Sequence, residues 1–171
     1  MFARISRNII FVLSFLFIGS AIAEEIKADT FLAKDRYEVG GRFQFSSQAK
    51  SGATNFSLTP NVGYFIKDRI SINGLLNTQY SGISSKVFGY FGLGASYYFK
   101  LEQQFAPFVS QNFTRTYGNS DAIMGGSTDF GVLNFLAPNV AFKTALEYNY
   151  NFKQSMNEGL FSLYGAFSIY F

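Results

Sequence analysis

Four charged residues form two pairs, and the spacing within each pair suits a β-strand. Glu38 and Arg42 lie four residues apart, and Lys143 and Glu147 lie four residues apart near the other end of the chain. Because alternate side chains of a strand point to opposite faces, each pair falls on one face of its strand. Charges of both signs on a confined face can constrict a passage, or they can form ion pairs that fill it. We favour a network of ion pairs, because buried charges need partners of opposite sign.

Residue types that commonly carry chemistry are absent or wrongly spaced. The chain has no histidine and no cysteine, so its hydroxyl groups lack the usual general base, and neither a disulfide nor a thiolate metal site can form. Asp121 and Asp129 flank a Gly-Gly pair, but their spacing lacks the ligand pattern of a calcium loop, and a solvated loop is the simpler interpretation. We therefore expect no enzyme activity, no cofactor and no metal.

The first residues have the organisation of a secretory signal peptide. Arg4 and Arg7 precede an apolar run over 9–18, which is too short to span a bilayer comfortably. Ala21 and Ala23 supply the A-x-A pattern at which signal peptidase cuts. An uncleaved anchor is the alternative, but the small residues at the exit and the acidic residues that follow favour cleavage. Without Arg4 and Arg7, 12 basic residues face 11 acidic ones, so no basic surface predicts nucleic-acid binding.

Beyond residue 23, no apolar run is long enough for a transmembrane helix, and apolar and polar residues alternate instead. In one such segment Phe142, Leu146 and Tyr148 alternate with polar residues that include Lys143 and Glu147. This period of two predicts strands with two distinct faces. The predicted strands are 37–46, 54–66, 70–80, 86–99, 105–117, 128–137, 142–151 and 161–171.

Three of these segments leave the strand register open. Pro60 interrupts 54–66 and would remove a ladder donor, so we expect a bulge or a late strand start there. In 105–117, Arg115 has the same parity as apolar residues, and in 128–137 neither face is clearly polar.

The links between the predicted strands alternate in length. Short turns at 67–69, 100–103 and 137–139 alternate with longer links near 47–53, 81–86, 118–127 and 152–159. Eight strands joined in this way form an up-and-down antiparallel barrel with both of its ends on the side of the short turns. We expect a signal peptide at 1–23, a short periplasmic segment at 24–34 and an outer-membrane barrel at 35–171.

The polar faces of the strands carry too few charges to coat a water-soluble barrel, but they suit a narrow hydrated interior. The apolar faces are then expected to meet lipid, where a closed barrel satisfies all backbone groups internally. Aromatic residues gather before the short turns, as in Tyr64-Phe65, Tyr97-Tyr98 and Tyr170-Phe171, and a second set lies near the longer links. We expect two aromatic girdles at the membrane interfaces.

The chain resembles the small outer-membrane barrel family that includes OmpX, OmpW, the transmembrane domain of OmpA and the opacity proteins. The resemblance rests on the signal pattern, the four hairpins and the alternating end Gly165-Ala166-Phe167-Ser168-Ile169-Tyr170-Phe171. It implies that Phe167, Ile169 and Phe171 form an assembly signal read by the barrel assembly machinery of a Gram-negative cell envelope. The enzymes of this kind of barrel depend on histidine, which this chain lacks.

The function expected from these observations is a non-enzymatic role in the bacterial outer membrane, either structural or in surface interaction of an adhesion-like kind. The alternative is a narrow, porin-like conduit for small or apolar solutes, as proposed for OmpW-like barrels. Besides outer-membrane lipid and the assembly machinery, the partners to expect are host or envelope surface ligands bound through the loops. We expect a monomer.

Overall fold

The computed structural model describes residues 28–47, 54–81, 86–99, 105–118, 123–152 and 159–171. The predicted signal peptide, with its cleavage site at Ala21 and Ala23, lies outside the described residues, as does the start of the predicted periplasmic segment. Within the described residues, no helix is long and apolar enough to cross a membrane.

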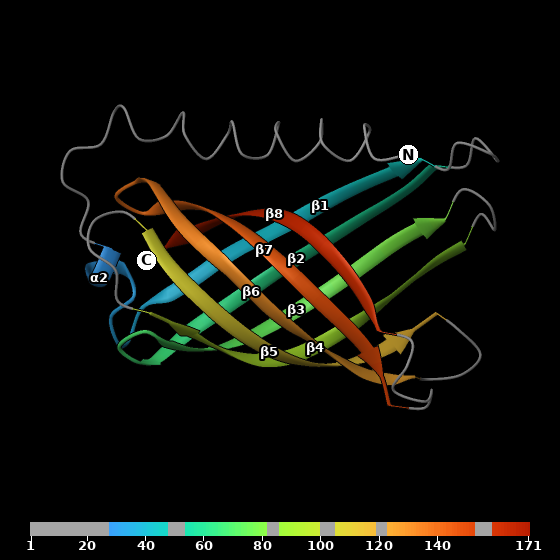
Figure 1. Cartoon of the computed structure of the whole chain (residues 1–171), viewed down its shortest axis with the longest axis horizontal. Helices are drawn as coiled ribbons and strands as arrows, with labels where there is room; N and C mark the ends of the chain where they lie inside the picture. The colour runs from blue at the N-terminus through green and yellow to red at the C-terminus, as the bar shows by residue number, and fades with distance from the viewer. Residues whose placement is uncertain (1–27, 48–53, 82–85, 100–104, 119–122, 153–158) are drawn as a thin grey trace.

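Eight antiparallel strands form a closed barrel in which each strand pairs with its neighbour in sequence and β1 pairs with β8 (Figure 1). The elements are α2 (Ala28–Phe31), β1 (Tyr37–Ser47), β2 (Thr54–Lys67), β3 (Ile70–Ser81), β4 (Lys86–Tyr98), β5 (Phe105–Tyr117), β6 (Met124–Ala137), β7 (Val140–Asn151) and β8 (Leu160–Tyr170). The predicted fold class, an eight-stranded up-and-down barrel, is confirmed.

The strand β6 begins at Met124 and not at residue 128, because Gly125 and Gly126 belong to the sheet and not to a loop. A side chain covers one of these glycines. A Cβ atom placed on Gly126 would lie 2.7 Å from the hydroxyl oxygen of Tyr150 on β7. The same hydroxyl accepts a hydrogen bond of 2.7 Å from Gln111 Nε2 on β5, so Tyr150 bridges three strands across the glycine. Glycine is needed here for close approach, whereas in the sequence it signals a loop.

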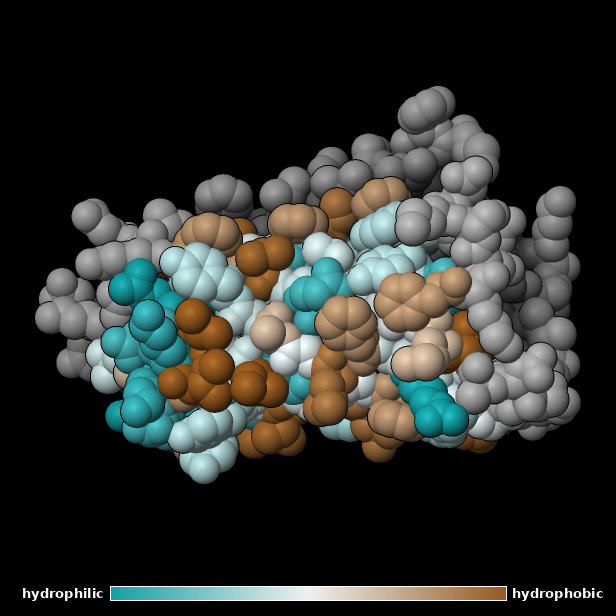
Figure 2. Space-filling model, turned by 90° about the horizontal axis from the view of Figure 1, so that it is seen from below, coloured by the Kyte–Doolittle hydropathy of each residue, from teal (hydrophilic) through white to brown (hydrophobic). Residues whose placement is uncertain are grey.

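The outward faces of the strands are mainly apolar. Large side chains there are widely exposed, as for Val62 at 53%, Leu93 at 68% and Phe130 at 60%. Figure 2 shows apolar side chains over the strands and hydrophilic ones gathered at the end where the short turns lie. A barrel of this polarity would aggregate in water, so the water-soluble alternative is wrong.

The structure settles two positions at which the sequence left the strand pattern open. Pro60 lies within β2 opposite Gly41, and the register with β3 is the same on both sides of it, so neither the expected bulge nor a late strand start occurs. The ladder between β2 and β3 instead omits Thr59 and Pro60. Arg115 lies on the exposed face of β5 near its loop end, where a long side chain can reach the polar membrane surface.

The seam between β1 and β8 is the shortest ladder of the barrel. It pairs Glu38 to Gly41 with Tyr170 to Phe167, and Tyr37 and Phe171 exchange two further backbone hydrogen bonds of 3.1 and 2.9 Å. Beyond these pairs the two strands diverge toward the longer links (Figure 1). By contrast, β1 pairs with β2 along its whole length.

Candidate functional site in the barrel lumen

The four charged residues singled out in the sequence all face the lumen and join β1 to β7 across β8. Inward residues of β8 between them are small, namely Ser162, Ala166 and Ser168, apart from Tyr164. Small side chains leave room for charges of β1 and β7 to meet. The structure pairs Glu38 with Lys143 and Arg42 with Glu147.

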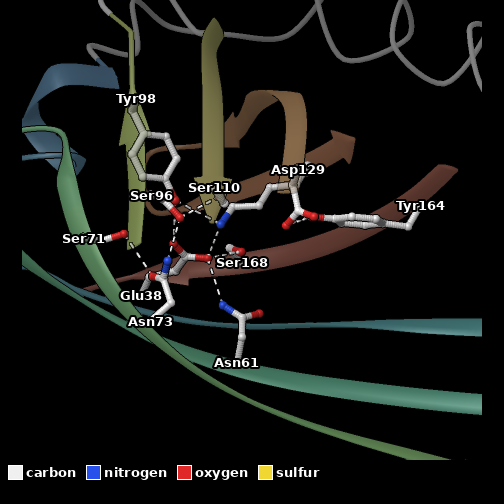
Figure 3. A network of polar contacts seen from close by, with 11 residues as sticks. Glu38, Asn61, Ser71, Asn73, Ser96, Tyr98, Ser110, Asp129, Tyr164 and Ser168 are labelled. Atoms are coloured by element: carbon white, nitrogen blue, oxygen red, sulfur yellow. Dashed lines mark hydrogen bonds and ion pairs between the residues drawn. The ribbon is translucent and has the colours of Figure 1, made fainter. Parts of the chain in front are cut away.

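Glu38 is fully buried and has a partner for each carboxylate oxygen (Figure 3). Lys143 Nζ donates to Oε1, and so do Asn61 Nδ2 at 3.2 Å and Ser168 Oγ at 2.8 Å. The hydroxyl of Tyr98 donates to Oε2 at 3.1 Å, and Lys143 also donates to that hydroxyl at 3.1 Å. A buried ion pair with this many hydrogen bonds is held in one geometry.

The second ion pair, between Arg42 and Glu147, lies four residues further along β1 and β7, toward the longer links. Arg42 Nη2 donates to Glu147 Oε1 at 2.8 Å and to the hydroxyl of Tyr90 at 3.1 Å. The guanidinium group lies 4.3 Å from the centre of the Tyr164 ring, in cation–π contact. Ser162 Oγ donates to the other oxygen of Glu147 at 3.0 Å.

A third carboxylate in the lumen was not expected from the sequence. Asp129 is only 6% exposed and faces inward from β6, so its assignment to a solvated loop is wrong. Its Oδ2 accepts hydrogen bonds of 3.3 Å from Tyr164 and from Asn112. The sequence contained a signal for this position, because Asp129 precedes Phe130, which points outward, and adjacent residues of a strand face opposite ways. Asp121 lies outside the described residues.

A small cavity lies beside the two ion pairs. It has a volume of about 70 Å³, and its lining includes Arg42, Asp129, Lys143 and Glu147 together with amide and hydroxyl side chains. A cavity of roughly 10–15 Å³ already holds one water molecule, so this cavity has room for several. It is far smaller than the several hundred Å³ of an ordinary ligand pocket.

An aromatic floor closes the lumen at the end with the short turns. It takes one inward side chain from each even-numbered strand: Phe65, Tyr98, Phe135 and Tyr170, all at most 1% exposed. The ring centres of Phe65 and Tyr170 are 6.2 Å apart, those of Phe135 and Tyr170 5.3 Å, and those of Phe65 and Tyr98 5.6 Å.

The expectation of a simple girdle before the short turns is therefore wrong for half of its members. Tyr64, Tyr97 and Phe171 are exposed on the outside, whereas the residue next to each of them in sequence points inward. Adjacent residues of a strand must face opposite ways. Two consecutive aromatics thus supply one ring to the membrane interface and one to the floor.

The segment before β1 covers this floor from outside. Leu32 is 1% exposed, and Phe31 packs on Phe135 with ring centres 5.6 Å apart. The amide of Arg69 donates to the carbonyl of Leu32 at 2.6 Å, and the amide of Asp35 donates to the carbonyl of Phe65 at 2.9 Å. The part of the predicted periplasmic segment that is described thus belongs structurally to the barrel.

The lumen of the described residues has ion pairs, amides and hydroxyls, but no cluster of His, Cys, Asp or Glu that could hold a metal ion. Each charge of the two pairs is neutralised by its partner. Fold and site together define a class: a transmembrane β-barrel whose interior is filled by its own side chains.

Comparison with solved structures narrows this class to small eight-stranded outer-membrane barrels. The N-terminal β-barrel domain of Pseudomonas aeruginosa OprF matches with a TM-score of 0.60 at 15% identity, over 81% of this chain and 98% of that one. Neisserial surface protein A, NspA, matches with a TM-score of 0.51 at 18% identity, over 78% and 94%. A designed transmembrane β-barrel matches with a TM-score of 0.53 at 14% identity, over 86% and 100%. The chain has the fold of outer-membrane barrels, as its apolar exterior requires.

No protein-family model matches the sequence. No curated protein matches it either.

Proposed function

We propose that this chain is a non-enzymatic outer-membrane barrel with a structural or surface-interaction role, and that it does not conduct solutes. The observation that carries the proposal is the closed lumen. Two ion pairs and an aromatic floor occupy the interior, and the cavity of about 70 Å³ beside the ion pairs is far smaller than an ordinary ligand pocket. Contacts with other molecules must then be made by the exterior and by the links between strands.

The comparisons support this proposal without assigning an activity. A designed barrel has the same fold, so the fold alone implies no particular function. One of the similar structures is that of a protein named as a surface protein, which fits a role in contacts outside the cell. The loops would then carry the specificity, since a rigid barrel presents them at a fixed spacing.

Conductance measurements test the closed lumen. The refolded protein should give no steady unit conductance in a planar lipid bilayer, because the four buried rings of the floor pack against one another across the lumen. The double variant Phe65→Ala/Phe135→Ala removes two floor rings and should conduct. The matched control is Phe113→Ala/Phe130→Ala, which removes two outward rings that are each 60% exposed and should stay silent. A steady channel from the unmodified protein would favour the conduit instead.

Thiol labelling of intact cells tests the orientation, and the absence of native cysteine keeps it unambiguous. A Phe152→Cys variant carries its thiol just beyond β7, at a site that is 56% exposed on the side of the longer links. It should react with an impermeant reagent. Pro138→Cys, in the short turn between β6 and β7, should react only after the outer membrane is permeabilised. The reverse pattern would show that the short turns are outside.

A further inference from the structure

The seam between β1 and β8 leaves two strand edges unpaired. Residues 42–47 of β1 pair with β2 but not with β8, and residues 160–166 of β8 pair with β7 but not with β1. These stretches are the halves of the two strands on the side of the longer links (Figure 1). Each presents a row of backbone donors and acceptors.

The unpaired edges lie at the depth of the membrane. A strand of about 9–11 tilted residues spans the apolar core, and β1 has 11 residues, of which only the first five bond to β8 or to Phe171. Along the open part of β8, Phe161 is 65% exposed and Leu163 is 52% exposed, as expected beside lipid. Hydrocarbon offers no hydrogen bonds, so an open sheet edge at this depth requires a partner.

We propose that a second copy of this chain covers the seam, with β1 of each copy pairing with β8 of the other. A two-fold arrangement brings both edges of one barrel against both edges of its partner, so one interface satisfies all four. Both ladders are antiparallel, like the ladder already present at the base of the seam. This inference depends on the membrane-barrel class and not on the proposed function. It differs from the monomer expected from the sequence.

A single inserted strand from another protein fits less well. Because β1 and β8 run antiparallel, a strand placed between them would be antiparallel to one edge and parallel to the other. A second copy avoids the weaker parallel ladder and needs no new register. Extending the observed register places Phe45 of one copy opposite Leu163 of its partner.

Cysteine cross-linking distinguishes the possible states of the seam. Protein with Phe45→Cys and protein with Leu163→Cys are refolded together in lipid vesicles and oxidised, with an affinity tag on one of them to mark heterodimers. The control mixture replaces Phe45→Cys with Leu146→Cys, because Leu146 already pairs with Leu163 inside one barrel. We expect at least tenfold more disulfide-linked heterodimer from the seam mixture than from the control mixture.

Two further measurements distinguish a seam that closes within one chain from a seam that pairs with a second copy. The double variant Phe45→Cys/Leu163→Cys should give disulfide-linked dimers, whereas Leu146→Cys/Leu163→Cys should give a bridged monomer. A bridged monomer from the seam variant would show that the seam closes within one chain and would overturn the proposal. Sedimentation equilibrium of the unmodified protein in detergent should show a dimer, and a monomer there would equally overturn the proposal.

Discussion

Replacing Glu38 by alanine is expected to lower the free energy of unfolding by about 3–5 kcal/mol, because it leaves the buried Lys143 ammonium without its carboxylate. Asn61, Ser168 and Tyr98 would also lose the acceptor to which they donate. Urea unfolding of the refolded protein in detergent, followed by circular dichroism, measures the change. The chain has no tryptophan, so fluorescence of that residue cannot serve.

A double-mutant cycle separates the ion pair from the loss of packing. Adding Lys143→Ala to Glu38→Ala removes the uncompensated charge, so the double variant should be clearly more stable than the sum of the single losses predicts. Lys34→Ala is the matched control, because Lys34 pairs with Asp35 at 3.9 Å with both side chains more than 60% exposed. That exposed pair should contribute at most about 1 kcal/mol. Equal urea midpoints for Glu38→Ala and Lys34→Ala would contradict an internal network.

Loss of Phe171 is expected to reduce assembly in cells severely. Phe167, Ile169 and Phe171 lie on the outward face at 51%, 41% and 59% exposure, where a receptor for the chain end can reach them. The resemblance to small outer-membrane barrels implies that this end is an assembly signal. The backbone of Phe171 also bonds to Tyr37 in both directions and so extends the short seam.

Two variants separate the signal from the seam. Phe171→Ala keeps the backbone bonds and should still refold in detergent, yet its level in the outer membrane should fall several-fold. Deletion of Phe171 removes those bonds as well and should also weaken the purified barrel. Heat-modifiable gel mobility of membrane fractions measures assembly, and Phe152→Ala, another exposed aromatic, is the control. If Phe171→Ala reaches wild-type levels in the membrane, the terminal ring is not a signal.

Much of the architecture is predictable because it follows from alternation along single strands. The period of two places Val39 and Phe130 outside and Glu38 and Lys143 inside, and the turn residues divide the strands. The expected strand bounds were wrong at Gly126, because glycine in a sequence signals a loop, and the bulge expected at Pro60 does not occur because the register continues past it.

The features that sequence alone did not predict depend on contacts between distant strands. The partner of Lys143 is settled by the small Ala166 and Ser168 on the strand between, and not by spacing along β7. The aromatic floor requires residues of four strands to meet at one depth, which depends on the stagger of the closed sheet. The open seam follows from how two chain ends meet, and no local pattern encodes that.

The cover over the floor has a consequence for the order of folding. Phe31 packs on Phe135, and the carbonyl of Leu32 accepts a hydrogen bond from Arg69, so the segment before β1 needs β6 and the turn between β2 and β3 to be in place. Although it precedes all the strands in the chain, it can dock only after most of the sheet has formed. Protection of the Arg69 amide from hydrogen exchange is therefore expected to appear late in folding. The time at which this protection appears marks the completion of the barrel.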